Sequence, residues 1–529
     1  MSEKKQAKEE IRSDLAELYQ RKSYLWDENR PEAVEKRRKS GQRTARENIS
    51  DLCDKDSFLE YGSLIVAAQR GRKSMQELIE KTPADGLIAG IGSVNGDLFE
   101  GKQTECVVLS YDYTVMAGTQ GAFNHKKTDR MMGVAKKAEN PIIFFLEGGG
   151  GRPGDVDFYP IIVGGLDLMT FAEFARLSGK VPRIAVVSGH CFAGNAAIAG
   201  CADVIIATEN TSIGMGGPAM IEGGGLGKYT PEEIGPANFQ VNNGVIDILV
   251  KDEAEAVFTA KKYLSYFQGN LSEWSCDDQE KLRDIVPEDR KWAYDVRKII
   301  QMMSDTDSVL ELRKEFGKSV VTAFIRIEGK PLGLIANNPR HLGGAIDSDA
   351  SDKMARFMQL CDTFGIPILS LCDAPGFMVG PDCEKTAMVR HASRLFVVGA
   401  SIEVPFMTIV LRKAYGLGAM AMSAGSFRES FFTVAWPTGE FGAMGLEGAV
   451  KLGFKKELDN TNSEEERNAL YEKLVGQAYQ QGKALNAASV MEIDEVIDPK
   501  DSRLWVSKAL KSIPESSYKN KQKRFIDSW

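Results

Sequence analysis

The chain has 529 residues, 43% of them hydrophobic and 26% charged, with a formal net charge of −8 at pH 7. Its length exceeds what one hydrophobic core usually supports, so two or three domains are expected. The acidic balance argues against a general nucleic-acid-binding protein, and no apolar run reaches the ~18–20 residues of a membrane-spanning helix.

The N-terminal 50 residues are polar and helical in pattern, with a basic run at 36–39 that we interpret as a solvated helix face or a phosphate contact. Strands then alternate with helices, which predicts an α/β protein. We expect an N-terminal domain over 1–265, a charged helical linker over 266–315 and a C-terminal domain over 316–529.

The chain repeats one pattern in its two halves. Residues 91–165 contain an apolar strand, a glycine-rich turn, a lysine-rich helix, a second strand and a second glycine turn, and residues 325–380 show the same order. The second strand ends at Glu147 and four glycines in the first half, and at Asp373 and Gly376 in the second. A duplication predicts two related domains and, often, a composite site.

A further strand in each half ends in a run of small residues, at 188–199 and at 415–422. Glycine and alanine let a substrate approach the backbone closely, and the N-terminus of a helix presents unpaired N–H groups. Such turns can form an oxyanion hole for an enolate or a tetrahedral intermediate. Tight helix–strand packing is the better explanation of one such turn alone, but a matched pair in a duplicated chain favours the oxyanion hole.

Other chemistries have weaker support. His190 and Cys191 are adjacent but lack an orienting partner for a nucleophile pair. The phosphate-loop pattern fails at Gly227 and at Gly317. The eight cysteines contain no CxxC pair, and the histidines show no metal spacing, so no metal is predicted. With no evident protein base, we expect a cofactor that supplies one.

Several segments in order resemble the carboxyltransferase (β) subunits of biotin-dependent acyl-CoA carboxylases, such as propionyl-CoA and methylcrotonyl-CoA carboxylases. These segments are 43–49, 56–61, 85–86, 111–118, 373–377, 412–416 and 435–440. The resemblance implies two tandem crotonase-like (ClpP/crotonase) domains, with carboxybiotin and acyl-CoA meeting between the N-domain of one subunit and the C-domain of another, usually in a hexamer built as a trimer of dimers.

The resemblance also implies roles for individual residues. The amides of Ala193 and Gly194 would hold the thioester enolate, and those of Leu417 and Gly418 the ureido oxygen of biotin. The other residues expected at the CoA or biotin sites are Gly149, Gly150, Arg152, Gly376, Phe377, Tyr415, Gly416 and Met420. The biotin nitrogen would take the α-proton, which explains the missing protein base.

No Met-Lys-Met biotinylation site or ATP-grasp loop is recognisable. We therefore expect one subunit that needs a biotin carboxylase and a biotin carboxyl carrier as partners. The charged N-terminal segment, which lacks the character of a signal or transit peptide, and the cysteines, several of which we interpret as small buried hydrophobes, predict a cytoplasmic protein. The identity of the acyl group is not readable. The alternatives are a sodium-linked acyl-CoA decarboxylase subunit with a membrane partner, and a biotin-free hydratase or a non-enzymatic scaffold.

Overall fold

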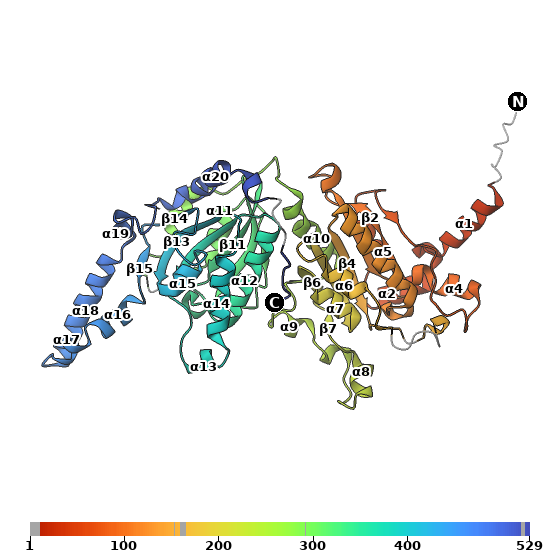
Figure 1. Ribbon diagram of the computed structural model, residues 1–529, viewed down its shortest axis with the longest axis horizontal. Helices are drawn as coiled ribbons and strands as arrows, with labels where there is room; N and C mark the ends of the chain where they lie inside the picture. The colour runs from red at the N-terminus through yellow and green to blue at the C-terminus, as the bar shows by residue number, and fades with distance from the viewer. Residues whose placement is uncertain (1–10, 153, 159–164, 291, 520–523) are drawn as a thin grey trace, which may run out of the picture. The chain divides into compact units, whose positions relative to one another are not determined.

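The computed structural model describes residues 11–152, 154–158, 165–290, 292–519 and 524–529. The chain forms two compact units (Figure 1). The first comprises residues 1–240 and 249–261, and the second comprises 241–248 and 262–529. The segment 266–315, expected as a linker, thus packs within the second unit.

Each unit is built on an eight-stranded sheet. The first has the order β1-β2-β3-β4-β5-β6-β8, with β7 paired to β5. Its strands are β1 (Leu59–Glu60), β2 (Leu87–Ser93), β3 (Glu105–Tyr111), β4 (Ile142–Gly148), β5 (Arg183–Phe192), β6 (Val204–Thr208), β7 (Ser212–Gly214) and β8 (Ile248–Val250). Its helices are α1 (Ser13–Ser23), α2 (Pro31–Lys39), α3 (Ala45–Leu52), α4 (Met75–Lys81), α5 (Ala122–Ala138), α6 (Thr170–Ala175), α7 (Gly194–Gly200), α8 (Pro218–Gly223), α9 (Ala237–Gln240) and α10 (Glu253–Gln268), which runs across the boundary.

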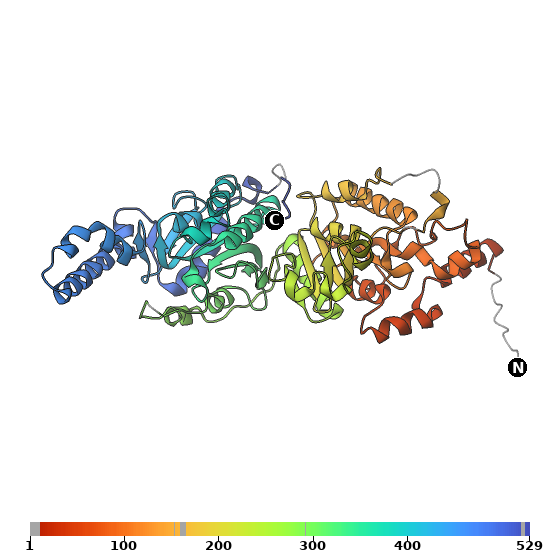
Figure 2. The same ribbon diagram turned by 90° about the horizontal axis from the view of Figure 1, so that it is seen from below.

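The second sheet has the order β16-β14-β13-β12-β11-β10-β9, with β15 paired to β13. Its strands are β9 (Leu310–Leu312), β10 (Val320–Ile327), β11 (Lys330–Asn337), β12 (Ile368–Ala374), β13 (Phe406–Tyr415), β14 (Phe432–Ala435), β15 (Glu440–Gly442) and β16 (Glu495–Val496). The helices are α11 (Val296–Met303), α12 (Ser348–Thr363), α13 (Pro381–Glu384), α14 (Met388–Gly399), α15 (Gly416–Ala421), α16 (Leu446–Gly453), α17 (Lys455–Asp459), α18 (Glu464–Gln481), α19 (Ala484–Ser489) and α20 (Ser502–Ser512). The blue helices α16 to α18 project from this sheet (Figure 2).

The two sheets share one topology. The antiparallel pair β2 and β3 leads into parallel β4, β5 and β6, just as β10 and β11 lead into β12, β13 and β14. The central strands β4 and β12 are buried along their whole length, which suits their continuous apolar sequences. The predicted duplication is therefore confirmed strand by strand.

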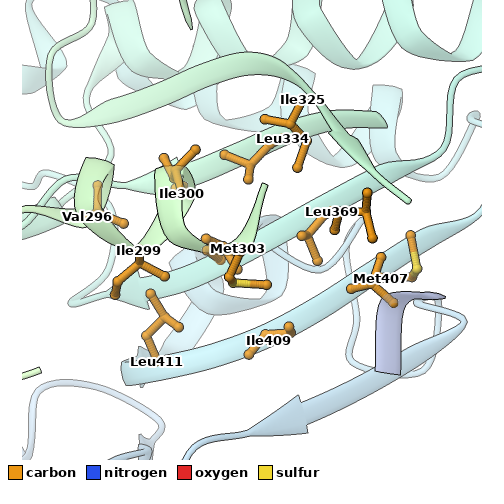
Figure 3. Packing of buried hydrophobic residues seen from close by; sticks show 14 of the residues in the cluster. Val296, Ile299, Ile300, Met303, Ile325, Leu334, Leu369, Met407, Ile409 and Leu411 are labelled. Carbon is orange, nitrogen blue, oxygen red and sulfur yellow. The ribbon is translucent and has the colours of Figure 1, made fainter. Parts of the chain in front are cut away.

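The core of the second unit explains why 266–315 belongs to it. On α11 the apolar residues Val296, Ile299, Ile300 and Met303 follow the helical i, i+3, i+4, i+7 spacing and are buried against the sheet (Figure 3). They contact a layer from β10 to β13 that includes Ile325, Leu334, Leu369, Met407, Ile409 and Leu411. No helix in the described part of the chain is long and apolar enough to cross a membrane.

Candidate active site

The first candidate donor is at the end of β5. Ala193, between β5 and α7, has φ 52° and ψ −120°, a conformation that costs a non-glycine residue on the order of 1–3 kcal/mol. Its N–H donates to the carbonyl of Gly214 at 3.0 Å. The Ala193 amide, predicted as an oxyanion donor, is therefore engaged within the sheet.

Gly194, the second predicted donor, begins α7. An amide in the first turn has no partner within the helix, and the Gly194 N–H has none elsewhere among the described residues. A Cβ at this position would lie 2.0 Å from Oε1 of Gln120. Gln120 is buried and donates through Nε2 to the Tyr111 hydroxyl at 3.1 Å. Only glycine fits beside that amide group.

The glycine loop after β4 lies against this turn. The Gly150 N–H donates to Oδ1 of Asn195 at 3.1 Å, and its carbonyl accepts from the Gln120 N–H at 2.7 Å. A Cβ on Gly150 would lie 2.5 Å from the Cβ of Ala193. Gly149 and Gly151 are exposed, and the Gly151 N–H has no partner in the described part of the chain. We call the loop 148–151 and the turn 193–194 the first cradle.

Arg152 follows the loop but does not face solvent. Its side chain is 3% exposed and forms an ion pair with Asp85 at 2.5 Å. It also donates to the Thr119 carbonyl at 2.9 Å. Burial raises the pKa of Asp85, and Arg152 opposes that shift. The guanidinium, predicted beside CoA, is used instead to anchor the loop.

The second unit has a matching arrangement between β13 and α15. Gly416 has φ 53°, and a Cβ there would lie 2.6 Å from the Ala443 carbonyl oxygen. Leu417 and Gly418 follow in the first turn of α15. A Cβ on Gly418 would lie 2.7 Å from the Cα of Gly376, so the helix and the loop after β12 touch. We call the loop 376–377 and the turn 416–418 the second cradle.

Four predicted residues in or beside the second cradle differ in their exposure. Leu417 and Met420 are 61% and 38% exposed, so both side chains can contact a ligand. Phe377 is half-buried, with its ring 6.3 Å from that of Phe396. Tyr415 is buried and donates to Glu440 at 2.9 Å, and burial raises the pKa of its hydroxyl.

The register of the two sheets shows which residues correspond. Phe192 pairs with Gly214 across β5 and β7, and Tyr415 pairs with Gly442 across β13 and β15. The next residue in each half, Ala193 or Gly416, has φ within a degree of the other's. Ala193 therefore corresponds to Gly416, one residue earlier than the predicted partner.

By the same register Gly194 corresponds to Leu417. The loops correspond too, because Gly151 is bridged to Gln120 and Phe377 to Ile346, both in parallel. No amide among Gly151, Gly194, Phe377 and Leu417 donates to a group in the described residues. Each cradle thus offers one amide from its loop and one from its helix.

The structure does not assemble a Cys–His nucleophile. Cys191 is fully buried, and burial raises the pKa of its thiol. Nε2 of His190 lies 3.2 Å from Glu232 Oε1. Cys191 and His190 therefore make separate contacts and do not form a nucleophile pair.

Sequence reasoning assigned no role to the residues that hold the cradles. Asn195 bridges the end of β4 and the loop of the first cradle. Its Nδ2 donates to the Glu147 carbonyl at 3.3 Å, and its Oδ1 accepts from the Gly150 N–H. Glu147 and Asp373 are buried acids at the ends of β4 and β12. In the sequence, both acids stand at the same position before a glycine turn, and this repetition could have identified them.

Known proteins match most of this chain. The model of the "Carboxyl transferase domain" family matches residues 36–526. The chain belongs to that family. The methylmalonyl-CoA carboxyltransferase 12S subunit of Propionibacterium freudenreichii subsp. shermanii is 34% identical over 492 residues, covering 90% of each chain. A propionyl-CoA carboxylase beta chain of Cereibacter sphaeroides is 30% identical and covers 96% of this chain and 98% of that one.

Solved carboxyltransferases have the same fold. A single-chain, multi-domain long-chain acyl-CoA carboxylase matches with a TM-score of 0.90 and 56% identity over 94% of this chain, which spans only 49% of that larger protein. The transcarboxylase 12S hexamer with bound methylmalonyl-CoA matches with a TM-score of 0.82 and 30% identity, covering 96% of each chain. The predicted family and the two crotonase-like domains are confirmed.

Proposed function

We propose that this chain is the carboxyltransferase component of a biotin-dependent acyl-CoA carboxylase, transferring a carboxyl group from carboxybiotin to the α-carbon, or the vinylogous γ-carbon, of an acyl-CoA. The observation that carries the proposal is the recurrence of one cradle in both units, each with a loop amide and a helix amide, at corresponding positions, that have no partner among the described residues. Two carbonyl groups become more negative during such a transfer, the thioester and the urea, and each needs its own donors.

The first cradle suits the thioester. The amides of Gly151 and Gly194 would donate to the oxygen that gains charge as the α-carbon loses its proton. Gly149 is exposed and leaves the backbone open to the acyl-CoA, while Gly150 is tightly packed and fixes the loop against the turn. Because these donors are fixed by Gln120 and Asn195 before a ligand arrives, little reorganisation is needed at the moment of reaction.

The residues of the second cradle fit a biotin ureido group. Gly376 leaves open space in front of the loop, whereas Gly416 and Gly418 allow the turn to pack closely against Ala443 and Gly376. The amides of Phe377 and Leu417 are the matching donors for a carbonyl oxygen. Leu417 and Met420 add exposed apolar surface for the ring. When bound, biotin would supply the transferable carboxyl group and a nitrogen able to accept a proton.

The partners follow from this assignment. We propose that a biotin carboxylase and a biotinylated carrier charge the cofactor elsewhere, and that this chain forms a homo-oligomer, as the 12S relative forms a hexamer. The relatives reported above are named carboxylases and a carboxyltransferase, which favours carboxylation over sodium-linked decarboxylation. Long-chain acyl-CoA is the first substrate to test, because the carboxylase that is 56% identical acts on that class.

The chain can be tested without knowing its partners, by running the reaction in reverse. Purified protein is incubated with malonyl-CoA or methylmalonyl-CoA, or with a carboxylated long-chain acyl-CoA, with and without free biotin. We expect decarboxylated acyl-CoA to form only when biotin is present. Turnover of an enoyl-CoA without biotin would instead support a hydratase, and no turnover of any carboxylated thioester would contradict the proposal.

A further inference from the structure

The basic run at 36–39, expected at a solvated face, contains a buried arginine. The Arg37 side chain is 7% exposed and reaches Glu147 with both nitrogens of its fork, at 2.6 and 2.9 Å. Its neighbour Arg38 is 52% exposed and pairs with Glu47 on the surface. Arg37 therefore forms a buried ion pair and Arg38 a surface one, a difference that the sequence alone does not show.

Glu147 can reach Arg37 because Gly189 in β5 has no side chain to block the carboxylate. A Cβ on Gly189, where φ is +80°, would lie 2.5 Å from Oε1 of Glu147. Beside Gly189 the carboxylate also approaches Gln42, whose Nε2 donates to Oε1 at 3.3 Å and to Ser188 Oγ at 3.4 Å. Gln42 in turn accepts from Arg37 at 2.7 Å. The N-terminal segment thus closes over the end of β4.

The backbone of Glu147 is tied to the first cradle. Its carbonyl accepts from Asn195, which also holds the Gly150 N–H and follows Gly194 in α7. Glu147 therefore connects Arg37, bonded to its side chain, with Asn195, bonded to its carbonyl, and so with the loop and the start of the helix that carry the donor amides.

The second unit contains the same kind of anchor, made from different elements. Asp373, fully buried at the corresponding place in β12, pairs with Arg412 at 3.0 Å and accepts from the Tyr294 hydroxyl at 2.9 Å. It also accepts from the Lys413 N–H at 3.0 Å. The arginine comes from the neighbouring strand here and from α2 in the first unit. The acid is the common feature.

We propose that Glu147 and Asp373 are positioning residues that fix the point where each glycine loop leaves its strand, and that Arg37 makes the N-terminal segment part of the first cradle. The inference rests on the proposed function, but it concerns residues that touch neither ligand. Buried charge pairs of this kind hold one geometry, because moving either partner leaves an uncompensated charge.

The test compares Glu147→Gln with the wild-type protein in the reverse assay. The amide keeps the size of the side chain but loses the ion pair. Oxyanion donors act mainly in the transition state, so a shift of the donor amides should lower kcat and leave KM for the acyl-CoA little changed. We expect kcat to fall about 10- to 100-fold, the loss that a displacement of catalytic groups by about 1 Å can cause. Arg37→Gln should behave alike, and the double variant should lose no more than the worse single one. Arg38→Gln, the neighbouring exposed position, should match the wild type.

A pH profile separates positioning from mere stability. The titratable groups facing Glu147 are Arg37, Glu253 at the start of α10, Tyr113 after β3 and Cys191 on β5. Burial and the nearby Glu253 raise the pKa of Glu147 to about 7. Below that pH the ion pair is weakened, so the ratio of wild-type to Glu147→Gln activity should approach one, while above it the ratio should be largest. The ratio cancels pH effects common to both proteins.

Hydrogen exchange gives a readout that does not depend on activity. In Glu147→Gln we expect faster exchange in peptides covering 146–152, with exchange at 374–378 unchanged, and the converse in Asp373→Asn. Normal kcat and normal loop exchange in Glu147→Gln would overturn the inference while leaving the proposed function intact. An inactive wild-type protein would overturn the proposed function and leave the exchange result still interpretable.

Discussion

At the scale of single residues, the two cradles combine strained and permissive positions. The residue after β5 is Ala193 and the residue after β13 is Gly416, and both have φ near 52°. Alanine tolerates this position only because the surrounding contacts hold it, with the Gly214 carbonyl on its N–H and Gly150 against its Cβ. The amide that follows, at 194 or 417, has no hydrogen-bond partner among the described residues.

Removing one amide donor tests that geometry directly. Leu417→Pro deletes the N–H in the first turn of α15, where proline is tolerated, and Leu417 already carries an exposed side chain. We expect kcat of the biotin-dependent assay to fall about 10²–10³-fold. Leu417→Ala keeps the N–H and is the matched control: we expect kcat to stay near the wild-type value, while KM for free biotin rises because apolar surface is lost. Equal losses in both variants would show that the side chain, not the amide, matters.

A pair of neighbouring glycines tests the packing of the first cradle. Gly150 has φ +85° and no room for a Cβ, whereas a Cβ on Gly149 would meet only Cγ2 of Thr119 at 3.7 Å. We expect Gly150→Ala to lower the free energy of unfolding by about 1–3 kcal/mol through backbone strain and overpacking, and to abolish activity. Gly149→Ala should fold as the wild type does, as measured by urea unfolding followed by circular dichroism. Comparable stability of both variants would refute this packing argument.

At the scale of helices and strands, the duplication extends to a buried lysine. Lys127 in α5 and Lys353 in α12 are both the sixth residue of their helix. Lys127 donates to the carbonyls of Gly62 and Leu87, and Lys353 donates to those of Phe316, at 2.9 Å, and Val320, at 2.7 Å. Each lysine ties its helix to the start of an antiparallel strand pair. The carbonyls that the two lysines contact lie outside the cradles, so we interpret the repetition as serving the fold.

The pH dependence of stability should reveal this lysine. Burial lowers the pKa of Lys353 from 10.5 to about 7. Between those values the unfolded chain binds more protons than the folded one, so this residue's contribution makes stability rise with pH. We expect Lys353→Met to cost about 1–3 kcal/mol by leaving buried carbonyls unpaired, and to cost more at about pH 9 than at about pH 6. Urea titrations at the two pH values measure the difference, and a larger cost at the lower pH would reverse our sign.

The elements were largely predictable, and the details of the site were not. Apolar strands ended by glycines mark β4 and β12 in the sequence, because a buried strand needs apolar residues on both faces. Ala193 was matched with Leu417, one residue too late, because an alanine occupies the positive-φ position at 193 where the second half has Gly416. Arg152 looked like a ligand because its partner, Asp85, lies 67 residues away along the chain. Contacts over such separations leave no local pattern.

At the scale of the whole molecule, the boundary between the units is not a single cut. The short segment 241–248 belongs to the second unit, although residues 249–261 after it belong to the first. It contributes Asp247, which pairs with Arg313 at 2.9 Å where both side chains are almost fully buried. A Cβ on Gly244, in the same segment, would lie 2.9 Å from the ring of Phe316. The segment is thus an integral part of the second unit.

This interleaving predicts the outcome of truncation and of one point change. Asp247→Ala leaves the buried Arg313 without its counter-charge, and breaking a buried pair typically costs about 3–5 kcal/mol. In the full chain we expect the melting transition of the second unit to move to lower temperature, with the reverse reaction intact below that transition. A fragment of residues 262–529 lacks Asp247 as well and should be less stable than the same unit in the intact protein. Lys251→Ala, at an exposed residue that follows the segment, is the matched control for calorimetry. If Asp247→Ala melted at the same temperature as this control, the segment 241–248 would contribute no stability to the second unit. A fragment that begins at residue 262 would then be as stable as that unit in the intact protein.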